Sequence, residues 1–353
     1  MITELRLFTF ATSQQEDKAM SVGFAIIGSN FITDTFIKGL QQCSQAKLVG
    51  IYSRDPAKAQ AKFTQHYGQP DAGIAFGSLE ALCACSDVDA VYIASPNSLH
   101  FAQSKQCLLA GKHVLLEKPA CSNQAQLSEL IELANQQKKL LAQGILSFSS
   151  PIYDRFKECV NKLGKIERYH GEYCQRSSRL DLLLKGELPN TFNPEFSNGA
   201  LMDLGIYPLA PMVALFGLPT KLQAQGKLLS TGVDGMGEIQ FDYPDLLASI
   251  AYSKITLGQN IIEIQGENGR LTVHSTSLFE RLELELITGE NTSIEGVDHV
   301  GAMRSQIVAF CQDVQSGTLL PSKVSHQISL AIQQLLDATR KQLGVIYPQD
   351  LEN

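Results

Sequence analysis

Between residues 22 and 146, short apolar runs rich in β-branched side chains alternate with amphipathic stretches. Four such runs cover residues 22–27, 47–52, 90–94 and 113–116, and a segment with helical spacing follows each of them. Continuous apolar strands separated by helices are typical of a parallel sheet that is covered on both faces. Parallel sheets bind ligands at the carboxyl ends of their strands, so the residues after each run are the first candidates for a functional site.

The pattern changes after residue 150. Pro151 begins an amphipathic helix that ends at Gly164, and the next segment, residues 165–175, predicts a strand. Strand-like segments separated by Gly, Asp and Asn follow between residues 222 and 286, which indicates a largely antiparallel sheet. Helical spacing then returns in residues 302–314 and 324–343. The sequence therefore predicts an α/β protein with a second, α+β domain after residue 150.

Composition and charge narrow the class of protein. With 353 residues and 44% apolar content, the chain is long enough for two domains of ~150 residues. The 29 Lys and Arg against 36 Asp and Glu give a net charge of −7, so we expect no surface for nucleic acid or an anionic membrane. Eight cysteines, scattered without zinc or redox spacing, favour reduced thiols and a cytoplasmic location.

No segment of the sequence has the pattern of a signal peptide or a membrane span. Residues 1–20 contain a short apolar patch broken by Glu4 and Arg6, unlike a signal peptide, and we interpret them as a disordered extension with Met20 as a candidate start. The longest uncharged apolar stretch, residues 204–219, contains three prolines and is shorter than the ~20 residues of a membrane span. We expect a soluble protein.

A strand-to-helix turn at residues 28–33 stands where a dinucleotide fingerprint would. Only its first glycine, Gly28, is present, and Asn30 and Thr33 replace the other two. Asn tolerates left-handed backbone, and both side chains can donate hydrogen bonds to phosphate. By itself the turn is equally consistent with a dinucleotide site and with a plain strand-to-helix turn. The candidate cofactor residues here are Gly28, Ser29, Asn30, Phe31 and Ile32.

The end of the second run bears on the choice of cofactor. Ser53 and Arg54 lie about 25 residues after Gly28, where NAD-binding proteins carry an Asp or Glu for the ribose. A hydroxyl and a guanidinium would bind a 2′-phosphate that a carboxylate repels, so NADP is favoured and NAD stays possible. An isolated Ser-Arg pair elsewhere would be only a solvated helix start.

Polar residues also follow the third and fourth runs. Ser95, Pro96, Asn97 and His100 come after the third, and Glu117 and Lys118 come after the fourth. Pro119 disfavours helix at Lys118, which keeps this lysine at the strand tip with its ammonium directed into the crevice. The alternatives are a solvated charge pair for Glu117 and Lys118 and, favoured for His100 taken alone, a histidine on a helix surface.

Asp203 and Tyr207 form the corresponding pair in the second domain. They are four residues apart in an apolar segment, so a helix would place them on one face. A buried Asp needs a partner, and Lys118 is a plausible one. The alternatives are a helix cap at Asp203 and a core tyrosine at Tyr207.

Together these segments resemble the Gfo/Idh/MocA family of oxidoreductases. The resemblance extends from Val22 to residues 344–348 and is most specific at residues 111–119 and 199–207. Many members have His where this chain has Tyr207, and the tyrosine form is similar to the branch of dimeric dihydrodiol dehydrogenase and xylose dehydrogenase. The family implies a Rossmann NAD(P)-binding domain, residues 21–150, and a C-terminal domain, residues 151–353. The second domain's large, mostly antiparallel open sheet would support substrate binding and a homodimer or homotetramer.

The resemblance implies hydride transfer between NADP and a carbinol carbon of a sugar, polyol or cyclic diol. We expect Tyr207 to be the general acid and base, because the Lys118 ammonium would lower its pKa from ~10 toward working pH. Lys118 would polarise the substrate oxygen, and Asp203 would hold Lys118 or the substrate. Asn97 and His100 are assigned to the nicotinamide ribose, and Arg176 or Arg179 to the substrate.

Two other functions stay open. One is redox-assisted glycoside cleavage with a tightly held NAD, which would show hydrolysis without net change of the cofactor. The other is a cofactor-binding regulator without turnover, suggested by the substituted glycine turn. The joint presence of Lys118, Asp203 and Tyr207 argues against a regulator, which needs none of them.

Overall fold

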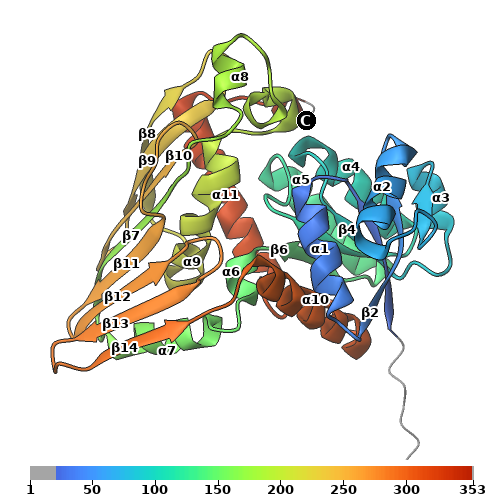
Figure 1. The fold of residues 1–353 in the computed structure, drawn as a ribbon. Helices are drawn as coiled ribbons and strands as arrows, with labels where there is room; N and C mark the ends of the chain where they lie inside the picture. The colour runs from blue at the N-terminus through green and yellow to red at the C-terminus, as the bar shows by residue number, and fades with distance from the viewer. Residues whose placement is uncertain (1–20, 352–353) are drawn as a thin grey trace, which may run out of the picture.

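The computed structural model describes residues 21–351, which form two sheets, each with its own helices (Figure 1). The predicted extension, residues 1–20, lies outside the described residues. The first sheet has six parallel strands in the order β3-β2-β1-β4-β5-β6. Its strands are β1 (Val22–Ile27), β2 (Ala46–Tyr52), β3 (Ile74–Phe76), β4 (Ala90–Ile93), β5 (His113–Glu117) and β6 (Leu141–Gly144).

Helices cover both faces of this sheet, as the apolar runs predict. The connecting elements are α1 (Phe31–Gln41), α2 (Pro56–Tyr67), α3 (Leu79–Ala84), η1 (Asn97–Leu99), α4 (His100–Leu109) and α5 (Gln124–Gln137). Two separate apolar clusters result, one beneath α1 and α2 and one beneath α3, α4 and α5. Because both faces are covered, the sheet leaves its carboxyl edge for a ligand.

The second sheet has eight strands in the order β14-β13-β12-β11-β7-β10-β9-β8. Only the β7–β10 pair is parallel, which confirms the predicted mostly antiparallel sheet. The strands are β7 (Ile166–Cys174), β8 (Lys221–Leu228), β9 (Asp234–Asp242), β10 (Leu247–Ser253), β11 (Ile261–Gly266), β12 (Gly269–His274), β13 (Arg281–Leu286) and β14 (Asn291–Glu295). The remaining elements are α6 (Leu146–Ser149), α7 (Tyr153–Lys162), α8 (Leu180–Leu184), η2 (Asn190–Phe192), η3 (Pro194–Phe196), η4 (Leu201–Gly205), α9 (Ile206–Phe216), α10 (His299–Ser316), α11 (His326–Leu343) and η5 (Pro348–Asp350).

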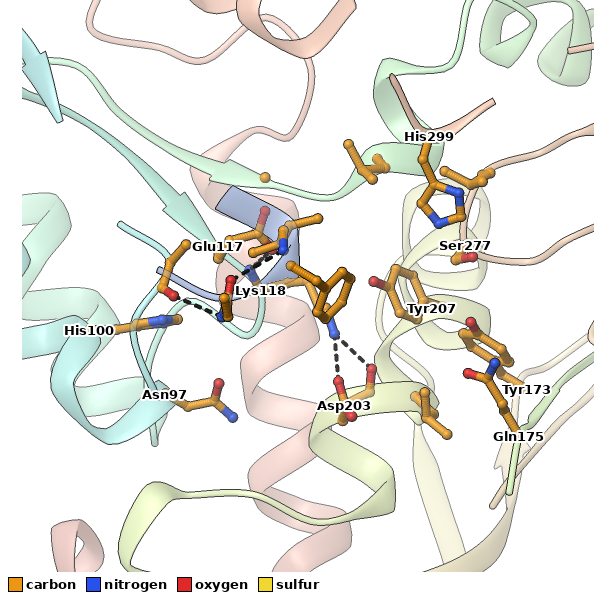
Figure 2. A pocket seen from close by; sticks show the side chains of 18 of the residues that line it. Asn97, His100, Glu117, Lys118, Tyr173, Gln175, Asp203, Tyr207, Ser277 and His299 are labelled. Atoms are coloured by element: carbon orange, nitrogen blue, oxygen red, sulfur yellow. Dashed lines mark hydrogen bonds and ion pairs between the residues drawn. The ribbon is translucent and has the colours of Figure 1, made fainter. Parts of the chain in front are cut away.

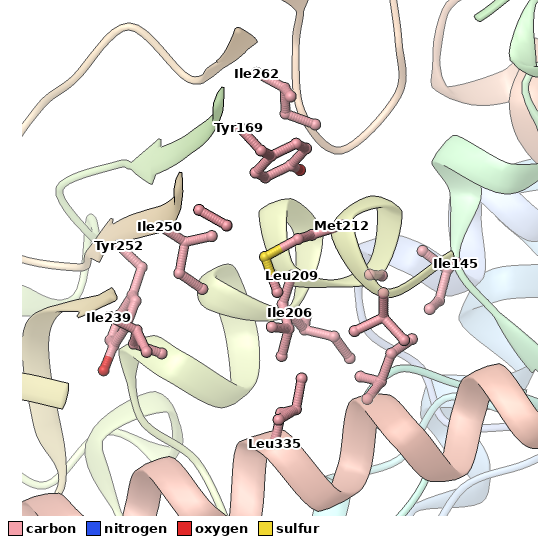
Figure 3. Packing of buried hydrophobic residues seen from close by; sticks show 14 of the residues in the cluster. Ile145, Tyr169, Ile206, Leu209, Met212, Ile239, Ile250, Tyr252, Ile262 and Leu335 are labelled. Atoms are coloured by element: carbon pink, nitrogen blue, oxygen red, sulfur yellow. The ribbon is translucent and has the colours of Figure 1, made fainter. Parts of the chain in front are cut away.

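Helix α9 is the centre of the second core. It packs between the inner face of the sheet and α11, with Ile206, Leu209 and Met212 fully buried (Figure 3). Segment Pro194–Phe216 is long and apolar enough to cross a membrane, but 72% of the apolar window is buried inside the protein. The apolar character of this segment is therefore explained by the core that it fills.

Helix α10 crosses back to the first domain. It packs on α1, and Ala302, Met303, Ile307 and Phe310 belong to the same apolar cluster as that helix. The domain boundary at residue 150 stays a prediction. Helix α10 comes from the second half of the chain but packs on the first domain, so a single boundary along the chain does not describe this contact. This crossing places the start of α10 beside the carboxyl edge of the first sheet.

A partly buried histidine at the start of β5 predicts a loss of stability in acid. The Nδ1 of His113 accepts a hydrogen bond from the Leu140 N–H at 3.0 Å, and burial, helped by Lys139, lowers the pKa of His113 to about 4. The unfolded chain takes up this proton below pH ~6.5, whereas the folded protein does not until about pH 4. Stability is therefore unaffected above that range and falls as the pH drops through it.

We expect His113 to lower the free energy of unfolding by about 1 kcal/mol between pH 7 and pH 5. This figure is reduced because the side chain is partly exposed. The measurement is urea denaturation of the wild type and of His113→Gln at several pH values. The difference in free energy of unfolding between the two proteins should change with pH. Parallel pH profiles would show that His113 contributes nothing.

Candidate active site

The turn between β1 and α1 lies against strand β4. Gly28 has a φ of +120°, and a Cβ there would lie 2.6 Å from the carbonyl oxygen of Ala94, so glycine is required. Asn30 caps α1, because its Oδ1 accepts hydrogen bonds from the N–H groups of Ile32 at 3.2 Å and Thr33 at 3.4 Å. Its Nδ2 donates to the Ala94 oxygen at 3.2 Å. Asn30 therefore fastens the turn to the neighbouring strand.

Two expectations about this turn are wrong. The φ of Asn30 is −83°, so this residue does not use the left-handed backbone that Asn tolerates. Thr33 is fully buried and its hydroxyl is shielded from solvent, so this hydroxyl is not available to a phosphate. Phe31, unlike Asn30 and Thr33, is 77% exposed, and it lines a cavity between the two domains. Ser29 precedes the cap and does not line that cavity.

Ser53 and Arg54 lie where β2 ends, just before Asp55 caps α2. Arg54 is exposed, and its guanidinium has no hydrogen bond or ion pair within residues 21–351. Neither residue lines the cavity. Since β2 pairs with β1 up to Tyr52, both residues nonetheless stand at the same sheet edge as Gly28.

A cavity of about 490 Å³ lies between the carboxyl edge of the first sheet and the inner face of the second (Figure 2). Both domains contribute polar side chains to it. The lining residues discussed below are Phe31, Ser95, Asn97, His100, Glu117, Lys118, Tyr173, Gln175, Asp203, Tyr207, Ser277 and His299. The cavity therefore brings the ends of β1, β4 and β5 together with Asp203 and Tyr207, as the sequence predicts.

Lys118 and Asp203 form the ion pair that the sequence predicts. The Lys118 Nζ lies 2.9 Å from Asp203 Oδ1 and donates also to the backbone oxygen of Asp203 at 2.9 Å. A second lysine, Lys254, pairs with Asp203 Oδ2 at 2.8 Å. Lys254 donates in addition to the backbone oxygen and hydroxyl of Thr191. One carboxylate therefore links two ammonium groups from separate elements.

Sequence reasoning missed Lys254. Its side chain is 3% exposed, and it follows directly after β10, in which alternate residues are buried. A lysine at the end of a half-buried strand is the signal in the sequence that could have suggested an ion pair. Its partner could not be found from the pattern, because Asp203 belongs to a different element.

Asp203 and Lys118 stabilise each other's charged forms. Although burial alone would raise the pKa of Asp203, Lys118 and Lys254 hold it well below its usual range. Burial alone would lower the pKa of Lys118, but Asp203 and Tyr207 raise it. At neutral pH the group therefore contains one carboxylate and the Lys118 cation beside Tyr207, with Asp203 itself placed by one turn of π-helix, Leu201–Gly205.

Tyr207 lies one turn beyond Asp203 and faces the same lysine. The Lys118 Nζ is 4.7 Å from the centre of the Tyr207 ring. Burial raises the pKa of Tyr207, and the opposing effect of Lys118 does not compensate for it. The prediction that Lys118 brings this pKa down toward working pH is therefore wrong. Tyr207 keeps its proton at neutral pH in the protein alone.

The position of His100 also differs from the expectation, because its side chain is buried and does not lie on a helix surface. Its two ring nitrogens each lie 2.9 Å from a backbone oxygen, of Pro119 and of Ser95, and burial lowers its pKa. Its ring still lines the cavity. His100 therefore joins the ends of β4 and β5, the two strands that carry Ser95 and Lys118.

The other predicted residues at these strand ends are also held in place. Asn97 donates to the Ser197 oxygen at 2.9 Å, which connects the two domains beside the cavity. Glu117 accepts a hydrogen bond of 2.5 Å from Tyr92, and burial raises its pKa. Ser95 donates to Gln103 at 2.6 Å, and Pro96 precedes η1.

Arg176 and Arg179, assigned to the substrate, do not line the cavity. Arg176 is paired with Asp181 at 2.6 Å, and Arg179 is exposed at the start of α8. Their role stays a prediction. Four residues that the sequence did not indicate form the far side of the cavity instead: Tyr173, Gln175, Ser277 and His299. Among residues 21–351, no group of His, Cys, Asp and Glu could hold a metal ion.

Comparison with known proteins agrees with this architecture. Residues 22–145 match the family model described as an oxidoreductase family with an NAD-binding Rossmann fold. Residues 155–272 match the Gfo/Idh/MocA C-terminal domain. In fold, the chain is similar to UDP-N-acetylglucosamine 3-dehydrogenase GnnA from Acidithiobacillus ferrooxidans, with a TM-score of 0.75 over 92% of this chain and 98% of that one, at 20% identity.

Curated relatives cover nearly the whole chain. It is 36% identical to scyllo-inositol 2-dehydrogenase (NADP(+)) IolU of Bacillus subtilis, over 93% of this chain and 99% of that protein. It is 27% identical to trans-1,2-dihydrobenzene-1,2-diol dehydrogenase of Mus musculus, over 94% of this chain and 99% of that protein. The predicted resemblance is confirmed: the chain belongs to the Gfo/Idh/MocA family of oxidoreductases with an NAD-binding Rossmann fold.

Proposed function

We propose that this oxidoreductase transfers a hydride between NADP and a carbinol carbon of a sugar, polyol or cyclic diol. The observation that carries the proposal is Lys118 beside Tyr207 at the carboxyl edge of the parallel sheet, facing a cavity of about 490 Å³. Support for the substrate class comes from relatives named as dehydrogenases of scyllo-inositol, D-xylose and a cyclic diol. Two of these names specify NADP(+).

The residues at the β1 end fit a dinucleotide. Gly28 lets the turn pack closely on the Ala94 carbonyl, and the positive end of α1 begins directly after this turn. Phe31 is exposed there, and Arg54 has a free guanidinium for a 2′-phosphate. These residues would hold the cofactor, with Asn97 and His100 on the nicotinamide side. When bound, NADP supplies the hydride acceptor or donor.

Side chains of the protein would transfer the proton to and from the substrate oxygen and would stabilise negative charge on it. The Tyr207 hydroxyl gives a proton to this oxygen in reduction and takes it in oxidation. The Lys118 ammonium stabilises negative charge on the same oxygen. Asp203 holds Lys118 at 2.9 Å, and Lys254 holds Asp203. Asp203 and Lys254 would therefore act as positioning residues.

The proposal is tested with the purified protein and a panel of sugars, polyols, cyclic diols and aldehydes, followed by NADPH absorbance. We expect turnover with at least one neutral polyol or sugar. NADPH binding without turnover on the whole panel would indicate a binding protein. Hydrolysis of a glycoside without net change in NADPH would indicate redox-assisted cleavage.

Arg54→Ala tests the cofactor preference. We expect it to weaken NADP binding about tenfold or more and to leave NAD binding nearly unchanged, because only NADP loses a charge-assisted hydrogen bond. Fluorescence titration of both cofactors gives the two dissociation constants. Arg155→Ala, which removes an exposed arginine of α7, is the matched control. Tighter binding of NAD than of NADP by the wild type would contradict the preference.

We also propose a cytoplasmic homodimer or homotetramer that associates through the outer face of the second sheet. This face carries charges of both signs on neighbouring strands, such as Arg168 beside Glu263 and Arg270 beside Glu285. An open face of this kind is suited to a second copy related by a twofold axis. Light scattering of the wild type and of Arg270→Glu would test it, and a monomeric wild type would overturn it.

A further inference from the structure

A buried polar cluster joins the two domains outside the cavity. We call it the domain clamp and define it as Ser122, Ser197, Asp337, Arg340, Gln349 and Asp350. Ser122 lies between β5 and α5 of the first domain, whereas the other members come from α11, from η5 and from the residue after η3. Helix α11 lies between the second sheet and α5 (Figure 1). None of the six residues lines the cavity, and the mechanism above does not use them.

Arg340 is the centre of the clamp, and its side chain is 4% exposed. Its Nη1 donates to Asp350 Oδ2 at 2.7 Å, and its Nη2 donates to the backbone oxygen of Ser122 at 3.1 Å. The same Nη2 lies 3.1 Å from Asp337 Oδ1, and the guanidinium carbon lies 4.3 Å from the centre of the Tyr347 ring. A buried guanidinium is costly unless hydrogen bonds and opposite charges compensate it. Two carboxylates of the second domain therefore hold a cation that binds the first domain.

Two serine hydroxyls form the second contact of the clamp. Ser122 and Ser197 are fully buried, and their Oγ atoms lie 2.7 Å apart. Because Ser197 Oγ donates to Gln349 Oε1 at 2.8 Å, Ser122 is the donor in the serine pair. The backbone oxygen of Ser197 accepts a hydrogen bond of 2.9 Å from Asn97, which lines the cavity. The contacts of the clamp therefore continue to the edge of the cavity.

The clamp lies close along the chain to the ion pair of the cavity. Ser122 comes four residues after Lys118, and Ser197 comes six residues before Asp203. The Ser122–Ser197 hydrogen bond therefore joins the same two segments as the ion pair does. Segments joined at one point can pivot about it, whereas a second joint removes that freedom. Four residues span at most about 14 Å, so a displacement of Ser122 is transmitted to Lys118.

We propose that Arg340 is a positioning residue for hydride transfer. By holding Ser122, it keeps the end of β5 at a fixed place relative to η4 and α9, so that Lys118 and Tyr207 meet the same substrate oxygen. Compared with apolar residues of the same volume, a buried ion cluster adds little net stability, so its contribution here is the fixed geometry. The inference rests on the proposed function for the identity of the reacting groups.

The test uses two variants, Arg340→Lys and Ser122→Ala. Lysine keeps a cation beside the two carboxylates, so the protein should fold, but it lacks the planar fork that reaches the Ser122 oxygen at the same time. Ser122→Ala removes only the serine hydrogen bond and decides the question if Arg340→Lys does not fold. Hydrogen exchange of the NADPH-loaded protein is followed by mass spectrometry. We expect residues 114–124 and 199–207 to exchange about fivefold faster in either variant, and residues 269–286 to stay unchanged.

Steady-state kinetics separates positioning from a general loss of structure. The substrate is the member of the sugar, polyol and diol panel that the wild type turns over fastest. We expect kcat to fall about tenfold in Arg340→Lys, with KM and NADPH affinity within about twofold, because a misplaced ammonium affects the transition state more than binding. Arg304→Lys is the matched control, since Arg304 donates to the backbone oxygen of Gln42 at 3.1 Å and joins α10 to the first domain outside the clamp.

Unchanged exchange of residues 114–124 and 199–207 in both variants would overturn the inference, as would an unchanged kcat, with or without a rise in KM. An equal effect of Arg304→Lys would also overturn it, because any contact between the domains would then act in the same way. The proposed function fails separately, if the wild type turns over no member of the panel. Hydrogen exchange still decides in that case whether the clamp holds the two segments.

Discussion

A Tyr207→Phe variant is expected to lose about a hundredfold or more in kcat, because the reaction loses its proton donor and acceptor. Phenylalanine keeps the ring that packs against Tyr173 and Lys118, so folding and cofactor binding should stay near normal. The measurement is steady-state kinetics in both directions with a substrate that the wild type turns over. NADPH titration and a melting curve serve as controls. Near-normal turnover would transfer the proton role to Lys118.

The pH dependence separates Tyr207 from Lys118 in the same experiment. Burial raises the pKa of Tyr207 above its ordinary value of 10, so the deprotonated base is scarce at neutral pH. Oxidation in the wild type should therefore keep rising with pH from 7 to about 10, tenfold per unit at most. Reduction uses the protonated form and should not fall over this range. In Tyr207→Phe the rise in oxidation should disappear.

A matched control is Tyr173→Phe. Tyr173 packs on Tyr207 and lines the same cavity, but its ring is not the one that Lys118 lies over. Removing its hydroxyl should leave the rise of oxidation with pH in place. If Tyr173→Phe flattens the profile as much as Tyr207→Phe, the proton passes through both hydroxyls.

Much of this architecture could be predicted from the sequence because its signals are local. The strand ends at Gly28 and Lys118 are marked by neighbouring residues, and the cost of burying Asp203 implied a cationic partner, which is Lys118. The far side of the cavity was not predictable in this way. Ser277 and His299 carry no pattern of their own, and only the folded topology brings them to Tyr207.

The expected pKa of Tyr207 and the expected exposure of His100 were wrong for the same physical reason. For Tyr207, the sequence indicated the nearby ammonium but not the extent of burial, which has the larger effect on the pKa. For His100, a histidine at a helix start gave no information on what covers it, and the backbone oxygens of Ser95 and Pro119 do so. Both quantities depend on contacts between elements, which hydrophobic periodicity does not specify.

Lys254→Met is expected to lower both stability and turnover. Methionine keeps the length of the side chain but removes the cation that pairs with Asp203 Oδ2 at 2.8 Å. Breaking one side of a fully buried pair costs about 3–5 kcal/mol. Asp203 keeps Lys118 and is 36% exposed, so we expect a smaller loss, about 1–2 kcal/mol, in the free energy of unfolding.

The effect on activity follows from the sharing of one carboxylate. Without Lys254, the whole charge of Asp203 acts on Lys118, which then stabilises the substrate oxygen less well. We expect kcat to fall about tenfold, with little change in NADPH affinity and partial recovery in Lys254→Arg. Lys227→Met, an exposed lysine on β8, is the matched control for both measurements. A loss of stability with unchanged kcat would restrict Lys254 to a structural role, and no change in either would show that the second ion pair contributes nothing.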